Sequence, residues 1–378
     1  MSATVSSIHK AIEAWAPAAT AQSYDNVGLL VGRLERSVSR VLVALDMTPA
    51  VLDEAIEMGA ECIVTHHPLI FKAIKSLTDA SYESFLALRL AEAGIALYAA
   101  HTNLDAARNG VSFQLARKLG VEQPDFLSML SDGMVKLVVF CPVDAAEDVR
   151  NAMFAAGAGQ VGNYSECSFS SAGLGTFKPG EGAAPHIGQS GGEREQVSEL
   201  RIEVEVPRWK LRGVIGAMID AHPYEEVAYD IIPVEQDFRD AGIGAVGDLP
   251  APVTFDVFLG TVAHVLDNQA LRVVGESSRM VQRVAVCGGS GSDFIGLAMR
   301  AGADVYVTSD ITYHRYFEVL DSAGNPRMAL VNAGHFETEE CTEDLLVDYL
   351  TQNVPGVRFT ATCHRTAPVR TWVAGRSS

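Results

Sequence analysis

The feature that most constrains the fold is an alternation of short, continuously apolar runs with segments of helical periodicity, which occurs twice along the chain. In the first copy, apolar runs and predicted helices alternate as 41–46, 49–58, 62–65, 81–93 and 95–100. In the second copy they alternate as 283–287, 292–301, 305–308, 312–323, 329–332 and 338–350. Continuously apolar strands are typical of parallel strands that helices cover on both faces. The pattern therefore predicts an α/β domain in three layers, with a parallel-rich sheet in the middle.

The middle of the chain has a different pattern. Residues 200–206 (LRIEVEV) alternate apolar with charged side chains, which is typical of a half-exposed antiparallel strand. Together with its neighbours this segment gives strand–helix–strand–strand–helix–strand, the order of a ferredoxin-like α+β unit. The Gly-, Ser- and Pro-rich stretch 173–192 is predicted to be a long mobile loop inside it. We therefore expect a split domain, 1–130 and 240–378, interrupted by an inserted domain, 131–239.

Charge and cysteine usage narrow the class of protein. The 378 residues carry 47 acidic and 29 basic side chains, and the net charge of −18 disfavours a nucleic-acid binder, which needs a basic surface. Six cysteines are scattered singly, which suits reduced thiols better than a disulfide framework. Residues 1–15 read as a short amphipathic helix rather than a signal peptide, and no apolar stretch is long enough to span a membrane. We expect a cytoplasmic protein.

Side chains that can bind metals gather where the predicted strands end. They are His66 and His67 after one strand, His101 and Asp105 after the next, Asp310 and His314 after a third, and His335 and Glu339 after a fourth. Because ligands bind beyond the carboxyl ends of parallel strands, we expect several of these residues to converge. His335 and Glu339 are spaced i, i+4, which places both on one face of a helix.

This set has the chemistry of a metal site. Imidazole suits Zn, Fe, Mn, Co or Ni, and the carboxylates of Asp105 and Glu339 can bridge two cations. Two ions about 3.5–4 Å apart would activate water for hydrolysis or bind a phosphate oxyanion. A histidine at a strand end can instead satisfy a backbone carbonyl, and for His101 and His314 taken singly this alternative is about as plausible. The stretch 287–292 (CGGSGS) can hold an anion at a helix N-terminus, but a tight strand–helix turn explains it equally well.

Several motifs in order resemble one known family. They are SYDNVGLLVG (23–32), THHP (65–68), HTNLD (101–105), GGSG (288–291), Asp310 with Tyr313–His314, and Gly334–His335 with Glu339. This set is similar to the dinuclear-metal toroid proteins named GTP cyclohydrolase I type 2 homologues, or NGG-interacting-factor-three-like proteins. Three further motifs, 162–165, 175–179 and 222–226, resemble the PII/CutA-like domain inserted in the longer members. The sequence departs from the family pattern at Ser309 and Val227, neither of which is an expected ligand.

The resemblance implies a site and an assembly. It implies two divalent metal ions per subunit, held by residues matching His66, His67, Asp105, His335 and Glu339, and a homohexameric toroid. Of the other residues at the strand ends, His101, Asp310 and His314 would support the metal ligands or act as acid/base groups.

Two functions follow as hypotheses. The first is a metal-dependent hydrolase of a nucleotide or other phosphorylated small molecule, with opening of the GTP ring as the named candidate. The second is a non-enzymatic toroid that stores or delivers metal, or regulates through a ligand-sensing insert. Threading of DNA through the ring is disfavoured by the net charge of −18.

Overall fold

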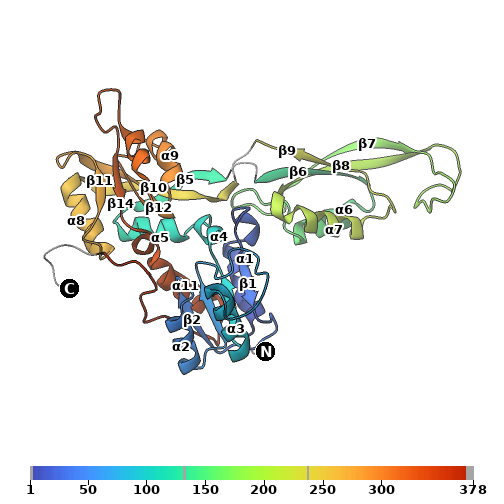
Figure 1. Cartoon of the computed structure of the whole chain (residues 1–378). Helices are drawn as coiled ribbons and strands as arrows, with labels where there is room; N and C mark the ends of the chain where they lie inside the picture. Colours follow the sequence, from blue (N-terminus) through green and yellow to red (C-terminus); the bar gives the residue numbers. More distant parts are fainter. Residues whose placement is uncertain (1–2, 131–132, 236–237, 372–378) are drawn as a thin grey trace. The chain divides into compact units, whose positions relative to one another are not determined.

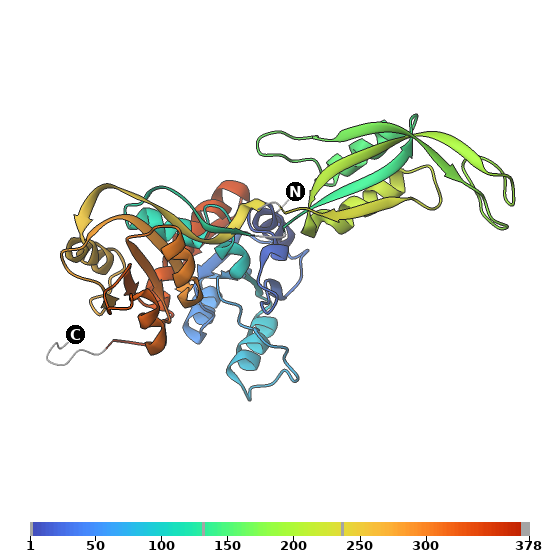
Figure 2. The same cartoon turned by 90° about the horizontal axis from the view of Figure 1, so that it is seen from above.

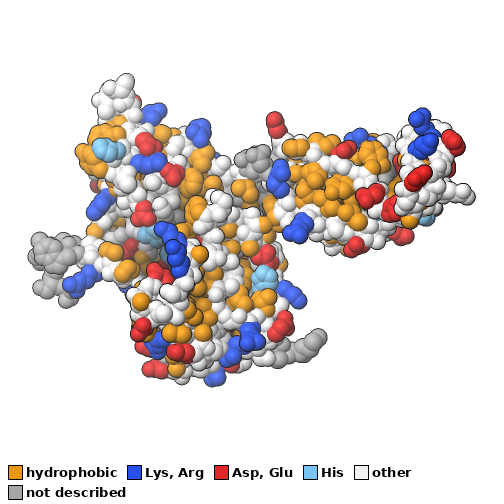
Figure 3. Space-filling model, turned by 45° about the vertical axis from the view of Figure 1, so that its right-hand side comes forward, with side chains coloured by type: hydrophobic (Ala, Val, Ile, Leu, Met, Phe, Trp, Pro, Cys, Tyr) orange, Lys and Arg blue, Asp and Glu red, His pale blue; other side chains and the backbone are white. Residues whose placement is uncertain are grey.

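The computed structural model describes residues 3–130, 133–235 and 238–371, and its contacts divide the chain into two compact units (Figure 1). The split unit contains Met1–Ser128 and Asp240–Ser378, and the inserted unit contains Met129–Arg239. Within the described residues, no helix is long and apolar enough to cross a lipid bilayer. The face drawn in Figure 3 carries acidic and basic side chains interspersed with one another.

The first sheet of the split unit has five strands. Their order is β1 (Gly28–Val31), β4 (Ala96–Ala99), β3 (Cys62–Thr65), β2 (Arg40–Ala44) and β15 (Arg358–Ala361), all parallel except β1. Successive side chains of β2 face opposite layers, since Val41 and Val43 pack in one core cluster and Leu42 and Ala44 in another. Helices α1 (Val5–Trp15) and α11 (Cys341–Asn353) contribute to the first cluster, and α2 (Pro49–Met58) and α3 (Tyr82–Ala93) to the second. Burial on both sides explains the continuous apolar runs.

A second, six-stranded sheet follows from the later part of the chain. Its order is β11 (Arg272–Val274), β14 (Ala329–Asn332), β13 (Val305–Ser309), β12 (Met280–Ser290), β10 (Phe238–Thr254) and β5 (Glu122–Leu130). Strands β12, β13 and β14 are parallel, whereas β11 and β10 run antiparallel to their neighbours β14 and β12. Helices α5 (Val111–Lys118) and α8 (Phe255–Val265) contact β12, and α9 (Ile295–Arg300) contacts β13.

The predicted α/β class is confirmed, but the split unit contains two mixed sheets rather than one parallel-rich sheet. Two predicted helices also differ. The segment 312–323 forms only the short 3₁₀ helix η4 (Tyr313–Val319), because the chain turns back through the bridge between Leu320 and Pro326. The helix expected over 338–350 begins earlier, as α10 (His335–Glu339) followed by α11.

The inserted unit is a four-stranded antiparallel sheet with two helices on one face (Figure 2). Its elements follow as β6 (Met134–Pro142), α6 (Ala146–Ala155), β7 (Phe169–Phe177), β8 (Glu195–Pro207), α7 (Leu211–Ala221) and β9 (Tyr229–Pro233). The strand order is β7-β8-β6-β9. Residues 173–177 were predicted to begin a mobile loop, but they belong to β7, where Gly173 pairs with Glu199. The glycines and serines of this segment have low strand propensity, so pairing with β8 decides its conformation.

Candidate metal centre

The loops and short helices after the strands of both sheets bring the ligand-type residues together. His66 and His67 follow β3 directly, because their backbone N–H groups continue the pairing with Ala44 and Leu45. After β4, the short helix α4 (Thr102–Asp105) carries Asp105, and His101 precedes it. After β14, Gly334 begins α10 with a φ of +91°, and His335 and Glu339 lie one turn apart on that helix.

Each of the four imidazoles has its Nδ1 bound to an oxygen acceptor. The acceptors are the Ala100 carbonyl for His66 (2.8 Å), Asp46 for His67 (2.7 Å), Asp25 for His101 (2.9 Å) and Asp310 for His335 (2.7 Å). A carbonyl or carboxylate can only accept, so Nδ1 carries the hydrogen in each ring. Every Nε2 is thereby left as the atom available to a cation, the arrangement that metal-binding histidines commonly show.

Glu339 lies at the centre of the cluster, with its two carboxylate oxygens facing different histidines. Its Oε2 is 3.0 Å from Nε2 of His67 and 3.1 Å from Nε2 of His335, while Oε1 is 3.8 Å from Nε2 of His66. Asp105 approaches His66 from another side, at 3.6 Å between Oδ1 and Nε2. Two groups of donors close enough to hold an ion therefore share Glu339: one with His67 and His335, the other with His66 and Asp105.

The geometry of the cluster is compatible with coordination of an ion. Within the cluster, the buried atoms without an assigned hydrogen-bond partner among the described residues include His66 Nε2, Asp105 Oδ1 and Glu339 Oε2. Buried polar atoms without partners cost free energy, so an ion that binds them would remove a penalty. Ligand atoms at about 2.1 Å from a tetrahedral ion lie about 3.4 Å from one another. The 3.4 Å between Nε2 of His67 and Nε2 of His335 agrees with this spacing.

The electrostatics of the cluster favour positive charge. Burial lowers the pKa of His67, but contacts with Asp46 and Glu339 outweigh burial and raise it to about 10. The same balance, with Glu339 and Asp310, raises the pKa of His335 to about 9. Burial raises the pKa of Asp105 to about 7, against the opposing effect of His66. Divalent ions compete with protons for the same atoms, so metal binding at this cluster depends on pH.

The glycine-rich stretch 287–292 has a packing role beside Glu339. Gly289 has a φ of +60°, and a Cβ there would collide with Glu339 Oε1. Its N–H donates to the Thr338 hydroxyl at 3.0 Å, which fixes α10 against the end of β12. The stretch also forms the tight strand–helix turn that the sequence allowed, since β12 ends at Ser290 and the 3₁₀ helix η3 (Ser292–Phe294) begins two residues later. Asp310 also has a positive φ, +53°, and this unusual conformation at a non-glycine residue aims its carboxylate at His335.

Not every residue named from the sequence joins the cluster. His101 does, since its ring centroid lies 5.2 Å from that of His66 and 5.3 Å from that of His67. His314 is exposed on η4, where its ring contacts Tyr313 and lies outside the groups of donors formed by the described residues.

Two carboxylates were missed by the sequence reasoning. Asp25 accepts from His101 and from the backbone N–H of Thr102, and Asp46 accepts from His67 and from the Thr366 hydroxyl. Their signals were present in the sequence, since Asp25 lies inside the motif 23–32 and Asp46 ends the apolar run 41–46.

A cavity of about 600 Å³ opens beside the cluster, within the range of 300–1,000 Å³ that small-molecule sites occupy. Its walls come from the metal cluster, the segment after β14 and the C-terminal segment. They include His67, His335, Asp310, Phe336, Arg272 and Pro368. Arg365 lies 4.2 Å above the ring of Phe336 and pairs with Glu337 at 2.6 Å, so the C-terminal segment is fixed along one wall. A substrate in this cavity would lie beside the partly exposed imidazoles of His67 and His335.

Comparison with known proteins gives consistent matches over most of the chain. A family model described as Duf34/NIF3 (NGG1p interacting factor 3) matches residues 3–368. A Bacillus subtilis protein named GTP cyclohydrolase 1 type 2 homolog is 43% identical over 325 residues, covering 86% of each chain. A Mycobacterium tuberculosis protein with the same name is 37% identical over 327 residues, covering 85% of each chain.

Solved structures give the same result. A Bacillus cereus protein related to NIF3 has a TM-score of 0.79 and 38% identity, covering 98% of this chain and 100% of its own. A Staphylococcus aureus protein has a TM-score of 0.76 and 29% identity, covering 98% and 99%. Both similarities span the split unit and the insert.

Proposed function

Because the chain belongs to the Duf34/NIF3 family, as the sequence motifs predicted, we propose that it binds two divalent metal ions and uses them in hydrolysis. The proposed ligands are His66, His67, Asp105, His335 and Glu339. The metal is one of Zn, Fe, Mn, Co or Ni, for which imidazole and carboxylate are suitable ligands. The proposed substrate is a nucleotide or another phosphorylated small molecule. GTP is the first candidate, since the curated relatives carry the name GTP cyclohydrolase 1 type 2 homolog.

One observation carries the proposal: the carboxylate of Glu339, only 3% exposed, directs its two oxygens at two different sets of donors. If Glu339 bound a single ion together with His67 and His335, the buried atoms His66 Nε2 and Asp105 Oδ1 would still have no partner. Glu339 therefore has the position of a bridging ligand.

The surrounding residues orient the ligands and handle protons. When bound, divalent ions supply Lewis acidity, which lowers the pKa of water and stabilises developing negative charge. Asp46 and Asp310 hold the rings of His67 and His335 in the tautomer that presents Nε2. His101, oriented by Asp25, is the proposed acid/base group, because its ring borders those of His66 and His67. His314, exposed on η4, would assist only a substrate that extends out of the cluster.

The test combines metal content with turnover. Metal bound per chain is measured by mass spectrometry for the wild type, Glu339→Gln, Asp105→Asn and, as a control, His264→Ala, which removes an exposed histidine of α8. We expect two ions per chain in the wild type and the control, and a loss of at least one in each ligand variant. The same proteins are incubated with GTP and a panel of phosphorylated metabolites, and formate or other products are measured. Wild-type protein with two ions and no product from any substrate would refute the hydrolase.

A second candidate is a protein that stores or delivers metal. The partial exposure of two proposed ligands favours it, since 22% of the His67 side chain and 40% of the His335 side chain are in contact with solvent. Ions held there can exchange without unfolding of the protein. Rapid release to a chelator, together with absent turnover, would support this function, whereas slow release with turnover would support the hydrolase.

The insert and the assembly complete the proposal. The order β-α-β-β-α-β and the strand order β7-β8-β6-β9 are those of a ferredoxin-like unit, which supports a PII/CutA-like domain that senses a ligand. We propose a cytoplasmic homohexameric toroid, from the family resemblance. Light scattering coupled to size-exclusion chromatography tests the hexamer, which requires a mass six times that of the 40.4 kDa chain.

A further inference from the structure

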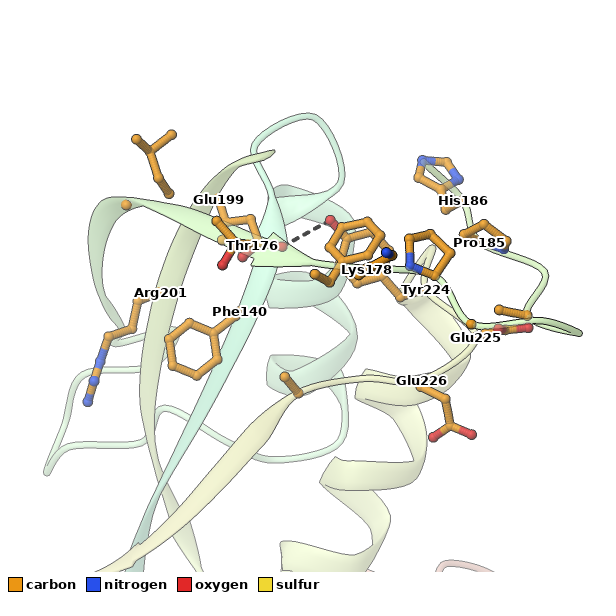
Figure 4. A pocket seen from close by; sticks show the side chains of 18 of the residues that line it. Phe140, Thr176, Lys178, Pro185, His186, Glu199, Arg201, Tyr224, Glu225 and Glu226 are labelled. Atoms are coloured by element: carbon orange, nitrogen blue, oxygen red, sulfur yellow. Dashed lines mark hydrogen bonds between the residues drawn. The ribbon is translucent and has the colours of Figure 1, made fainter. Parts of the chain in front are cut away.

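The inserted unit contains a cavity of its own, of about 660 Å³, which the metal chemistry does not use. It lies where two motifs that are far apart in the sequence meet, 175–179 at the end of β7 and 222–226 after α7. In Figure 4, Phe140 and Arg201 lie on one side of this cavity, and Thr176 and Glu199 lie in the middle. The other side is formed by Lys178, Tyr224, Pro185 and His186. The volume is within the range of small-molecule sites, about 300–1,000 Å³.

Aromatic rings from three segments line this cavity. Phe140 comes from β6, Phe177 from the end of β7 and Tyr224 from the loop after α7. The rings of Phe177 and Tyr224 are tilted, with centroids 6.1 Å apart. The guanidinium of Arg201 lies 5.9 Å from the centroid of Phe140, so one of these rings already has a cation beside it. Aromatic faces attract organic cations in this way.

Two glycines leave room in the same place. At Gly175 a Cβ would collide with the carboxylate of Glu199, so the glycine allows that carboxylate to lie against β7. Gly173 is paired with Glu199 of β8 through the backbone, but a Cβ at Gly173 would have no atom within 4 Å. Gly173 therefore faces open space, and a larger side chain at this position would fill part of the cavity.

The lining contains more carboxylates than cations. Glu199 is fixed by the Tyr224 hydroxyl, which donates to its Oε1 at 2.9 Å, and Glu225 accepts from the N–H of Ala184. Glu226 also lines the cavity and is exposed. Two cations, Lys178 and Arg201, also line the cavity, and Arg201 contacts Glu203 at 2.9 Å, a carboxylate outside the lining that Lys136 shares at 3.1 Å. Three carboxylates therefore line the cavity against two cations, and an excess of negative charge attracts positively charged ligands.

We propose that this cavity binds a small organic cation, a protonated amine or guanidinium attached to an apolar chain or ring. The apolar part packs against Phe140, Phe177 and Tyr224, and the cationic group lies near Glu199 and Glu226. Glu199 is well placed for this because the Tyr224 hydroxyl occupies only one of its oxygens. A ligand of this kind is opposite in charge to a nucleotide or phosphate.

Binding is tested on the full-length protein by isothermal titration calorimetry with four small probes, three of which have similar size and differ in charge. The probes are agmatine, phenethylamine as a cation with a ring, 2-phenylethanol as its neutral counterpart and phenylacetate as an anion. We expect saturable binding of the two cations, at least about tenfold weaker binding of the alcohol, as the loss of a charged hydrogen bond implies, and the weakest binding for the anion. Equal affinity for the three ring compounds, or no binding of either cation at millimolar concentration, would overturn the proposal.

Variants locate the site. Glu199→Gln and Gly173→Leu are expected to weaken cation binding at least about tenfold, the first by removing charge and the second by filling space. The matched control is Glu205→Gln, which removes a carboxylate of the same strand outside the cavity and should leave the affinity unchanged. Hydrogen exchange of the full chain should show that agmatine protects 172–186 and 224–228. Unchanged affinity in both site variants, or protection confined to other segments, would refute the assignment.

Discussion

Glu343 gives a prediction that connects one buried hydrogen bond to the pH dependence of stability. This half-buried side chain at the start of α11 accepts a hydrogen bond from the N–H of Leu45 at 2.8 Å. Burial, together with Glu340, Asp344 and Asp46, raises its pKa from 4.5 to about 7, against the lowering effect of that bond. Glu343→Gln keeps an oxygen that can accept from Leu45 but removes the charge.

The magnitude follows from the pKa. A carboxyl group whose pKa rises from 4.5 to about 7 on folding is disfavoured in its charged form by about 3 kcal/mol. Because Glu343 is only half-buried, solvent screening reduces this to about 1–2 kcal/mol. The folded state binds more protons than the unfolded state between pH 4.5 and 7, so the free energy of unfolding falls as pH rises through this window. The penalty is complete above pH 7 and absent below pH 4.5.

The measurement is urea denaturation at pH 5, 6, 7 and 8, in chelator, followed by circular dichroism and by hydrogen exchange of α11. We expect Glu343→Gln to be more stable than wild type by about 1–2 kcal/mol at pH 8 and to match it near pH 5. Asp348→Asn, which neutralises an exposed carboxylate on the same helix, is the control and should change stability by less than about 0.5 kcal/mol. If Glu343→Gln gained no more at pH 8 than the control, the electrostatic reasoning would be wrong.

Other perturbations test the cluster and the core. Asp310→Asn should weaken metal binding about 10–100-fold while keeping two sites, as measured by competition with a chelating dye, because Asp310 orients His335 without being a proposed ligand. Gly289→Ala should lower both stability and metal content, since a Cβ there collides with Glu339; normal loading would contradict this. Leu346→Ala, in the fully buried core, should cost about 2–5 kcal/mol in urea denaturation without changing the metal ligands. Removal of metal by chelator should lower the melting temperature of the wild type more than that of Glu339→Gln, since an ion at 100 times its Kd stabilises by about 2.7 kcal/mol.

The inner strands could be predicted from the sequence because burial on both faces requires a continuous run of apolar residues. Residues 41–44 alternate between two core clusters, and both clusters require apolar side chains. An apolar run does not indicate which other strand it pairs with. Strand β15 joins the first sheet from the far end of the chain, beside β2, and its mixture of Arg358 and Thr360 with apolar residues gave no strand signal. The expectation of one sheet was wrong because the strands of the two repeats of the pattern pair in separate sheets.

The candidate metal ligands could be named from the sequence because they are of metal-binding types and directly follow predicted strands. His66, His67, Asp105, His335 and Glu339 were all named from the sequence, and the structure brings all five together. Their partners were harder to predict, because Asp25 and His101 are separated by 76 positions and meet only in the folded chain. His314 shows the opposite case, since its position after a strand suggested a role but η4 leaves it exposed.

The insert leaves and rejoins the split unit at two neighbouring strands, and this determines how easily its length can change. Strands β5 and β10, which precede and follow the insert, are neighbours at one side of the six-stranded sheet. The whole segment between them is therefore equivalent to an enlarged loop between adjacent strands, and closing a flexible loop costs only about 2 kcal/mol more for 100 residues than for 10. A short turn in its place would leave every proposed metal ligand on its own strand or helix. We therefore expect that the insert can be lost or replaced without a change in the residues of the metal centre.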